Sequence, residues 1–113
     1  MNFKSRSEIT DKLVELMNES KLSYDQKQKV CTVVKNLKNT TDIQKDRFIS
    51  FYGLDKNSDK GQKLGEIAEK YNCSTTAIRR SVVSVKNKLS RLNENVEIIK
   101  KIIDENNNSE GEN

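Results

Sequence analysis

Apolar residues recur along most of this chain at spacings of three and four, which is the period of one face of an α-helix. The first such run is Ile9, Leu13, Leu16 and Met17. The chain has no proline and only 5% aromatic residues, so it is poorly suited to a turn-rich, aromatic-rich β-sandwich. The sequence therefore predicts an all-α fold, a small helical domain.

Polar residues and one glycine mark where these helices begin and end. Ser7 precedes the first apolar run and predicts a helix over residues 7–19. The motifs Ser-x-x-Gln at Ser23 and Thr-x-x-Gln at Thr41 are capping boxes and predict two further helix starts. Gly53 comes where the third helix needs a left-handed residue to end it.

The 113 residues are enough for one domain of ordinary size. We expect two helices within residues 1–40 and the remaining helices within 41–105. The polar segment 55–62 predicts an exposed loop. The segment 106–113 is polar and acidic overall, which predicts a disordered tail.

The chain has no histidine, the commonest general base and the commonest zinc ligand in proteins. Its two cysteines, Cys31 and Cys73, cannot form a four-ligand metal site by themselves. We therefore expect no enzymatic activity, no metal and no cofactor. No apolar run is long enough to cross a bilayer and no signal-peptide pattern is present, so we expect a cytoplasmic protein without a membrane partner.

Charge is unevenly distributed along the chain. The formal net charge is +4, but the last ten residues hold four acids and no base. The first 103 residues therefore carry 21 bases against 13 acids. Between Lys70 and Asn93 there are six bases and no acid, which favours a polyanionic partner such as nucleic acid. A solvated basic face without a partner is the alternative.

The segment after the polar loop predicts two helices joined by a short turn. The first helix covers residues 64–71, Asn72-Cys73 forms the turn, and Ser74 caps the second helix. The small Ala68 lies where the two helices must approach closely, as in a helix-turn-helix. The polar residues left outside on the second helix are the candidate DNA-binding residues Thr75, Thr76, Arg79, Arg80, Lys86 and Lys88.

The apolar residues of this second helix continue from Ile78 to Ile103 in alternating steps of four and three. This heptad pattern predicts one long helix of about thirty residues. Heptads are used in homodimeric coiled coils, but the C-terminal half can also pack on the chain's own first helices. The flanking positions offer no opposite-charge pairs between parallel chains, so we expect self-packing and a monomer.

Residues 46–92 resemble region 4 of bacterial RNA polymerase sigma factors, the region that reads promoters. The resemblance is carried by Tyr52-Gly53-Leu54, the polar loop, Leu64-Gly65-Glu66-Ile67-Ala68, the Ser74 cap and the basic end Lys88-Leu89-Ser90-Arg91-Leu92. With the preceding helix it covers residues 27–92.

The resemblance implies that the second helix enters the major groove of the minus 35 promoter element. It also implies that a neighbouring surface docks on the flap of the RNA polymerase β subunit. Thr75, Thr76, Arg79 and Arg80 fall where the family places its base and phosphate contacts. Thr75-Thr76-Ala77 replaces the Arg-Glu-Arg opening typical of the family, so the family's usual target sequence is not implied.

Side-chain chemistry supports the same assignment independently. An arginine near the N-terminal turns of such a helix can bond bidentately to guanine, so Arg79 is the candidate base-reading residue. Arg80, Lys86 and Lys88 are better suited to phosphates, which position the helix without reading sequence.

The expected function is that of a DNA-binding transcription regulator with double-stranded DNA and RNA polymerase as partners. The chain has no room for the separate domain that melts promoters, so we expect a free-standing sigma region. Such a region acts with a second sigma-like polypeptide, activates promoters or modulates the host's sigma factor. The alternative is a helical protein interaction module, a sigma partner or antagonist, without sequence-specific DNA binding.

Overall fold

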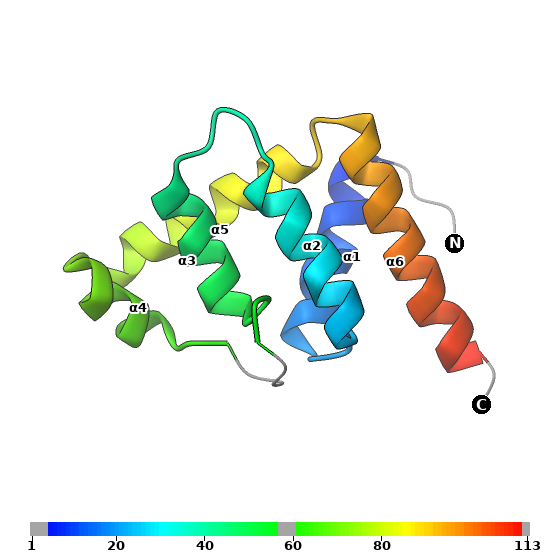
Figure 1. The fold of residues 1–113 in the computed structure, drawn as a ribbon, viewed down its shortest axis with the longest axis horizontal. Helices are drawn as coiled ribbons and strands as arrows, with labels where there is room; N and C mark the ends of the chain where they lie inside the picture. Colours follow the sequence, from blue (N-terminus) through cyan, green and yellow to red (C-terminus); the bar gives the residue numbers. More distant parts are fainter. Residues whose placement is uncertain (1–4, 57–60, 112–113) are drawn as a thin grey trace.

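The structure is a computed structural model that describes residues 5–56 and 61–111, with side chains as far as Asn107. The described residues form six helices and no strand, which confirms the predicted all-α fold. Of the predicted loop 55–62, residues 57–60 lie outside the described part of the chain. The helices are α1 (Arg6–Asn18), α2 (Tyr24–Lys35), α3 (Asp42–Tyr52), α4 (Leu64–Tyr71), α5 (Thr75–Leu89) and α6 (Asn93–Gly111) (Figure 1).

Both predicted capping boxes are confirmed. The Ser23 hydroxyl accepts the N–H of Gln26 (3.2 Å), and the Gln26 side-chain oxygen accepts the N–H of Ser23 (3.0 Å). Thr41 and Gln44 make the same reciprocal pair at the start of α3. Each box satisfies two backbone groups that a helix start would otherwise leave unpaired.

The predicted cap of the first helix is wrong by two residues. The N-cap is Ser5, whose hydroxyl accepts the N–H of Glu8. Ser5 has the extended backbone that a cap requires (φ −152°, ψ 164°), whereas Ser7 is already inside the helix.

Helix α3 ends as predicted, at a left-handed Gly53 with φ 64° and ψ 35°. The N–H of Leu54 then donates to the carbonyl of Ile49 (3.0 Å), and the Leu54 side chain is fully buried. A residue with a Cβ would be strained at this φ, so glycine allows the chain to turn and bury the leucine.

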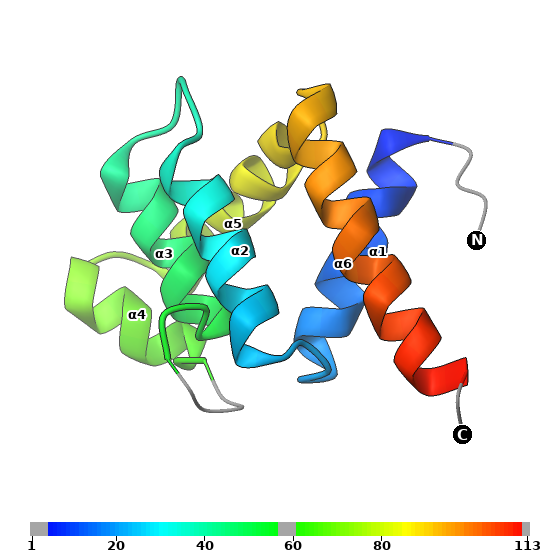
Figure 2. The same ribbon diagram turned by 45° about the vertical axis from the view of Figure 1, so that its right-hand side comes forward.

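Helix α5 is the central helix of the fold, in contact with α1, α2, α3 and α4. One face of α5 is buried through Ile78, Val82, Val85 and Leu89. Every helix contributes side chains to the same hydrophobic core. Helix α6 crosses α1 and also contacts α2 (Figure 2), so the C-terminal half packs on the first helices of its own chain, as predicted.

The predicted single long helix is wrong, because α5 ends at Leu89 and α6 begins at Asn93. The N–H of Ser90 bonds to the carbonyl of Asn87 and that of Arg91 to the carbonyl of Lys88, which tightens the last turn. A helix that continued straight would carry the apolar residues of α6 away from α1 and α2. Turning back buries those residues, and each such burial contributes about 1.5 to 3 kcal/mol.

The predicted disordered tail is also wrong over its first residues. The backbone of α6 is helical as far as Gly111, and the rest of the tail, residues 112–113, lies outside the described part. Asn106 is buried and its side-chain amide donates to Gln26 (2.8 Å). Gln26 in turn donates to Glu105 (3.3 Å), so polar contacts with α2 hold this part of α6 in place.

Two glycines that flank the start of α4 should respond in opposite ways to alanine. A Cβ at Gly61 would overlap the backbone carbonyl of Phe51, so we expect Gly61→Ala to destabilise the protein by about 1 to 3 kcal/mol. A Cβ at Gly65, in the first turn of α4, meets nothing within 4 Å. Gly65→Ala is therefore expected to stabilise the protein by about 0.5 to 1 kcal/mol. Urea unfolding followed by circular dichroism measures both changes, and equal effects of the two variants would contradict the expectation.

Candidate nucleic-acid interface

The connection between α4 and α5 is formed as predicted, by a short turn and a serine cap. Asn72 has a left-handed backbone (φ 52°, ψ 51°) and ends α4. The N–H of Cys73 donates to the carbonyl of Ala68 (3.0 Å), and the Ser74 hydroxyl accepts the N–H of Ala77 (3.1 Å). These local bonds fix the point at which α5 begins, and α4 and α5 pack against each other.

A side chain of α3 that the sequence analysis did not single out braces this connection. Arg47 donates to the Ser81 hydroxyl (2.9 Å) and to the Cys73 sulfur (3.6 Å). Its guanidinium also lies over the Tyr71 ring, 4.8 Å from the centroid. One arginine thus contacts the end of α4, the turn and the middle of α5, which holds α5 at a defined angle to α3.

The residue before Arg47 makes a second brace to α4. Asp46 accepts hydrogen bonds from the Tyr71 hydroxyl and from Lys70 (3.0 Å for Lys70). Burial acts to raise the pKa of Asp46, but the bonds from Tyr71 and Lys70 and the Lys70 charge outweigh it and leave the pKa below its ordinary value. Burial, then the hydrogen bond and charge of Asp46, raise the pKa of Tyr71 to about 12.

The Tyr71 pKa gives this brace a measurable signature. Folding favours the neutral phenol of Tyr71, so the contact with Asp46 contributes fully to the free energy of unfolding below the ordinary tyrosine pKa of 10.0. That contribution is lost as the pH rises through about 12. We expect Asp46→Asn to move one tyrosine titration to lower pH, measured by tyrosinate absorbance. Glu69→Gln, the same charge change at an exposed position of α4, is the control and should leave that titration in place.

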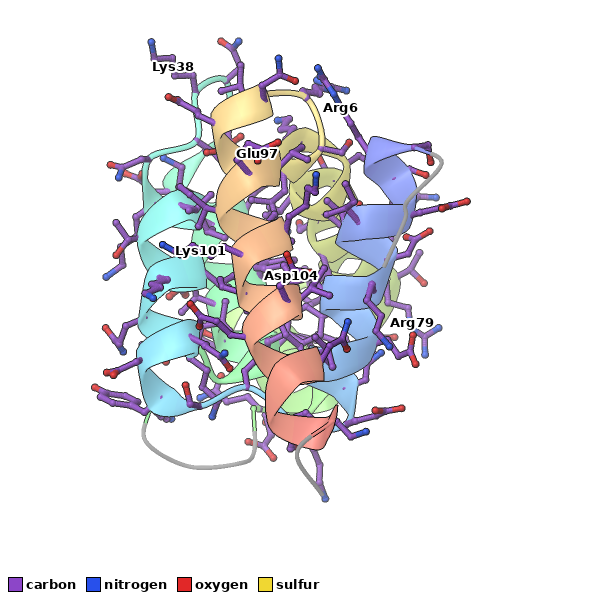
Figure 3. The ribbon with its side chains drawn as sticks, turned by 90° about the vertical axis from the view of Figure 1, so that its right-hand side faces the viewer. Arg6, Lys38, Arg79, Glu97, Lys101 and Asp104 are labelled. Carbon is purple, nitrogen blue, oxygen red and sulfur yellow. The ribbon has the colours of Figure 1, made fainter. Side chains whose placement is uncertain are left out.

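The exposed face of α5 carries four of the predicted DNA-binding residues, namely Thr75, Thr76, Arg79 and Arg80. Figure 3 shows Arg79 projecting at the edge of the molecule, on the side away from α2. A shallow depression of about 440 Å³ runs along this face, and no acidic residue lines it. The residues that line it, hereafter the α5 stripe, are Thr76, Arg79, Arg80, Val83, Ser84, Asn87 and Arg91.

The structure does not bring the two predicted lysines into the α5 stripe. Lys86 forms an ion pair with Asp11 of α1 (2.9 Å), because α1 crosses α5 at that point. Lys88 donates to the carbonyl of Asn39 in the loop between α2 and α3. Neither contact is visible in the local sequence, since each joins segments that lie far apart along the chain.

Four stripe residues were missed by the sequence analysis: Val83, Ser84, Asn87 and Arg91. A signal for them was present, because Val83 and Asn87 follow Thr76 by seven and eleven residues and so share its face of the helix. Val83 is 51% exposed, which places an apolar contact between the arginines. Such a contact can pack against a thymine methyl group.

The described residues contain no group of three or more His, Cys, Asp or Glu side chains that could hold a metal ion. None of their helices is both long and apolar enough to cross a membrane.

Cys31 is buried, and burial raises the pKa of its thiol above the ordinary value. The depression along α5 is lined by arginine, threonine, serine and asparagine side chains and by Val83.

No family model, no curated protein and no solved structure matches this chain.

Proposed function

We propose that this protein is a DNA-binding transcription regulator whose α5 helix enters the major groove of a promoter duplex. The observation that carries the proposal is the α5 stripe, an acid-free row with three arginines on the exposed side of the central helix. Among the described residues, no carboxylate lies within ion-pair distance of Arg79, Arg80 or Arg91. The stripe is thus a cationic surface that no acid in the described part of the chain neutralises.

The dimensions of α5 suit this role. An α-helix with its side chains is about 10 to 12 Å across, and the major groove is about 12 Å wide. Near the N-terminal end of α5, Arg79 can bond bidentately to guanine, and the Thr76 hydroxyl can bond to a neighbouring base. Arg80 lies one position further round the helix and suits a phosphate. The braces made by Arg47 and Asp46 support such reading because they fix α5 relative to α3 and α4.

The contact with RNA polymerase belongs to the same proposal. It is supported by the resemblance of residues 46–92 to sigma region 4, in which the neighbouring surface docks on the polymerase. We propose binding rather than catalysis for this chain, because it has no histidine and the stripe contains no acid or base with a catalytic partner.

The test is selection of bound duplexes from a random pool, followed by titration of the selected duplex at increasing salt. An enriched motif, bound with an affinity that falls steeply with salt, is the expected result. Absence of binding at about 50 mM salt would overturn the proposal.

A protein interaction module is the second candidate, and a groove between α2 and α6 favours it. This depression of about 450 Å³ contains the apolar side chains of Val33, Ile98 and Ile102, and 39% of Ile98 is exposed. If this role is correct, Ile98→Glu abolishes co-purification with RNA polymerase while Arg79→Ala does not. Retention of RNA polymerase by Ile98→Glu, together with loss of duplex binding in Arg79→Ala, would favour α5 as the functional surface.

A further inference from the structure

A second acid-free depression lies at the C-terminal end of the α5 stripe and shares Arg91 with it. Its volume is about 240 Å³, and the residues that line it are Leu37, Lys38, Asn39, Lys88, Arg91 and Leu92. Three of these six residues are basic and none is acidic. Arg91 lines both depressions, so the second depression lies directly beside the α5 stripe.

Tertiary contacts build this second depression from two segments that are far apart in the sequence. The loop after α2 and the turn between α5 and α6 both lie at the upper edge of the molecule in Figure 1, and side chains from both line the depression. Lys88 donates to the carbonyl of Asn39, which ties the turn to the loop. Arg6 of α1 donates to the carbonyl of Arg91 (3.0 Å) and so fixes the turn from the other side.

The cations of this depression are available to a ligand. Lys38 and Arg91 are exposed, and no carboxylate of the described residues lies within ion-pair distance of either side chain. Lys88 uses one of its three N–H donors on Asn39 and keeps two. Phosphate is the anion that such a cluster suits best, because it can accept several charged hydrogen bonds at once.

We propose that this depression is a second phosphate-binding site, which takes the sugar-phosphate backbone of the duplex that α5 reads. This inference rests on the proposed function. Arg79 lies ten residues before Leu89, the last residue of α5, which is about 15 Å along the helix axis, and Arg91 follows beyond that end. That separation exceeds the width of the major groove, about 12 Å. When Arg79 is at the base edges, the Arg91 end therefore lies over the backbone that borders the groove.

Lys38→Gln, Arg91→Gln and the double variant test this site without disturbing the core, because both side chains are exposed. The matched control is Lys101→Gln, the same charge change on the exposed side of α6, where Figure 3 shows Lys101 well away from both Lys38 and Arg79. The affinity of each protein is measured for a mixed-sequence duplex of about 30 bp, three helical turns, between about 50 and 200 mM salt.

Each single variant is expected to lower the slope of log affinity against log salt by about 0.9, and the double variant by about 1.8. The motif selected from a random pool should stay the same, because phosphate contacts carry no sequence information. Slopes equal to that of Lys101→Gln would overturn the second phosphate site and leave the proposed function standing. If the wild-type protein binds no duplex at about 50 mM salt, both proposals are overturned.

Discussion

Replacing Phe48 with alanine is expected to destabilise the protein by about 3 to 5 kcal/mol. The Phe48 side chain is fully buried in the core, and its ring packs edge-on against Tyr52 with centroids 4.9 Å apart. It lies on α3, which packs against α5. Total stabilities of domains are about 5 to 15 kcal/mol, so the loss is a large share of the free energy of unfolding.

The matched control is Ile43→Ala, on the same helix but at a residue that is 52% exposed. It should change stability by no more than about 0.5 kcal/mol. Urea unfolding followed by circular dichroism gives both values. If Phe48→Ala cost no more than Ile43→Ala, the burial of the Phe48 ring in the core would be contradicted.

Arg79→Ala is expected to weaken binding to the selected duplex by about 10- to 100-fold relative to mixed-sequence DNA. A bidentate arginine–guanine contact discriminates against the wrong base by about 1 to 3 kcal/mol, and that discrimination disappears with the side chain. Affinity for mixed-sequence DNA should fall much less, because it depends on phosphate contacts. Competition binding with the two duplexes at one salt concentration measures the ratio directly.

Lys86→Ala is the control for this prediction, because Lys86 lies two turns further along α5 but is paired with Asp11. We expect it to change neither the affinity ratio nor the selected motif. Asp11 is largely exposed, with 58% of its side chain in solvent, so the loss of this pair should also cost little stability. A loss of specificity in Lys86→Ala as large as that in Arg79→Ala would contradict the assignment of Arg79 to base reading.

The helix ends that were predicted correctly depend on bonds between close neighbours in the sequence. Ser23 with Gln26 and Thr41 with Gln44 are three residues apart, so each capping box is complete within one turn. Gly53 and Asn72 adopt the left-handed backbone that these two residue types tolerate best. Such features can be predicted because the capping bonds and backbone preferences that produce them involve only neighbouring residues and need no tertiary contact.

The break between α5 and α6 could not be predicted in the same way. The apolar spacing is the same on both sides of Ser90, and a straight helix and a bent pair of helices show the same pattern. Leu92 fits the heptad pattern but is 45% exposed, because it lies in the turn. Only the packing of α6 on α1 and α2 decides between the two arrangements.

The sequence by itself determined the all-α class, most of the helix starts and the exposure of Arg79 and Arg80, since a period of 3.6 residues and local capping bonds set all three. The tertiary structure alone decided which cations remain unpaired. It pairs Asp11 with Lys86 and bonds Lys88 to the carbonyl of Asn39. It also brings Arg47 into contact with the turn before α5 and with α5 itself. These contacts join residues 26 to 75 positions apart, and no local pattern encodes such pairs, because they form only when burial of the core brings the helices together.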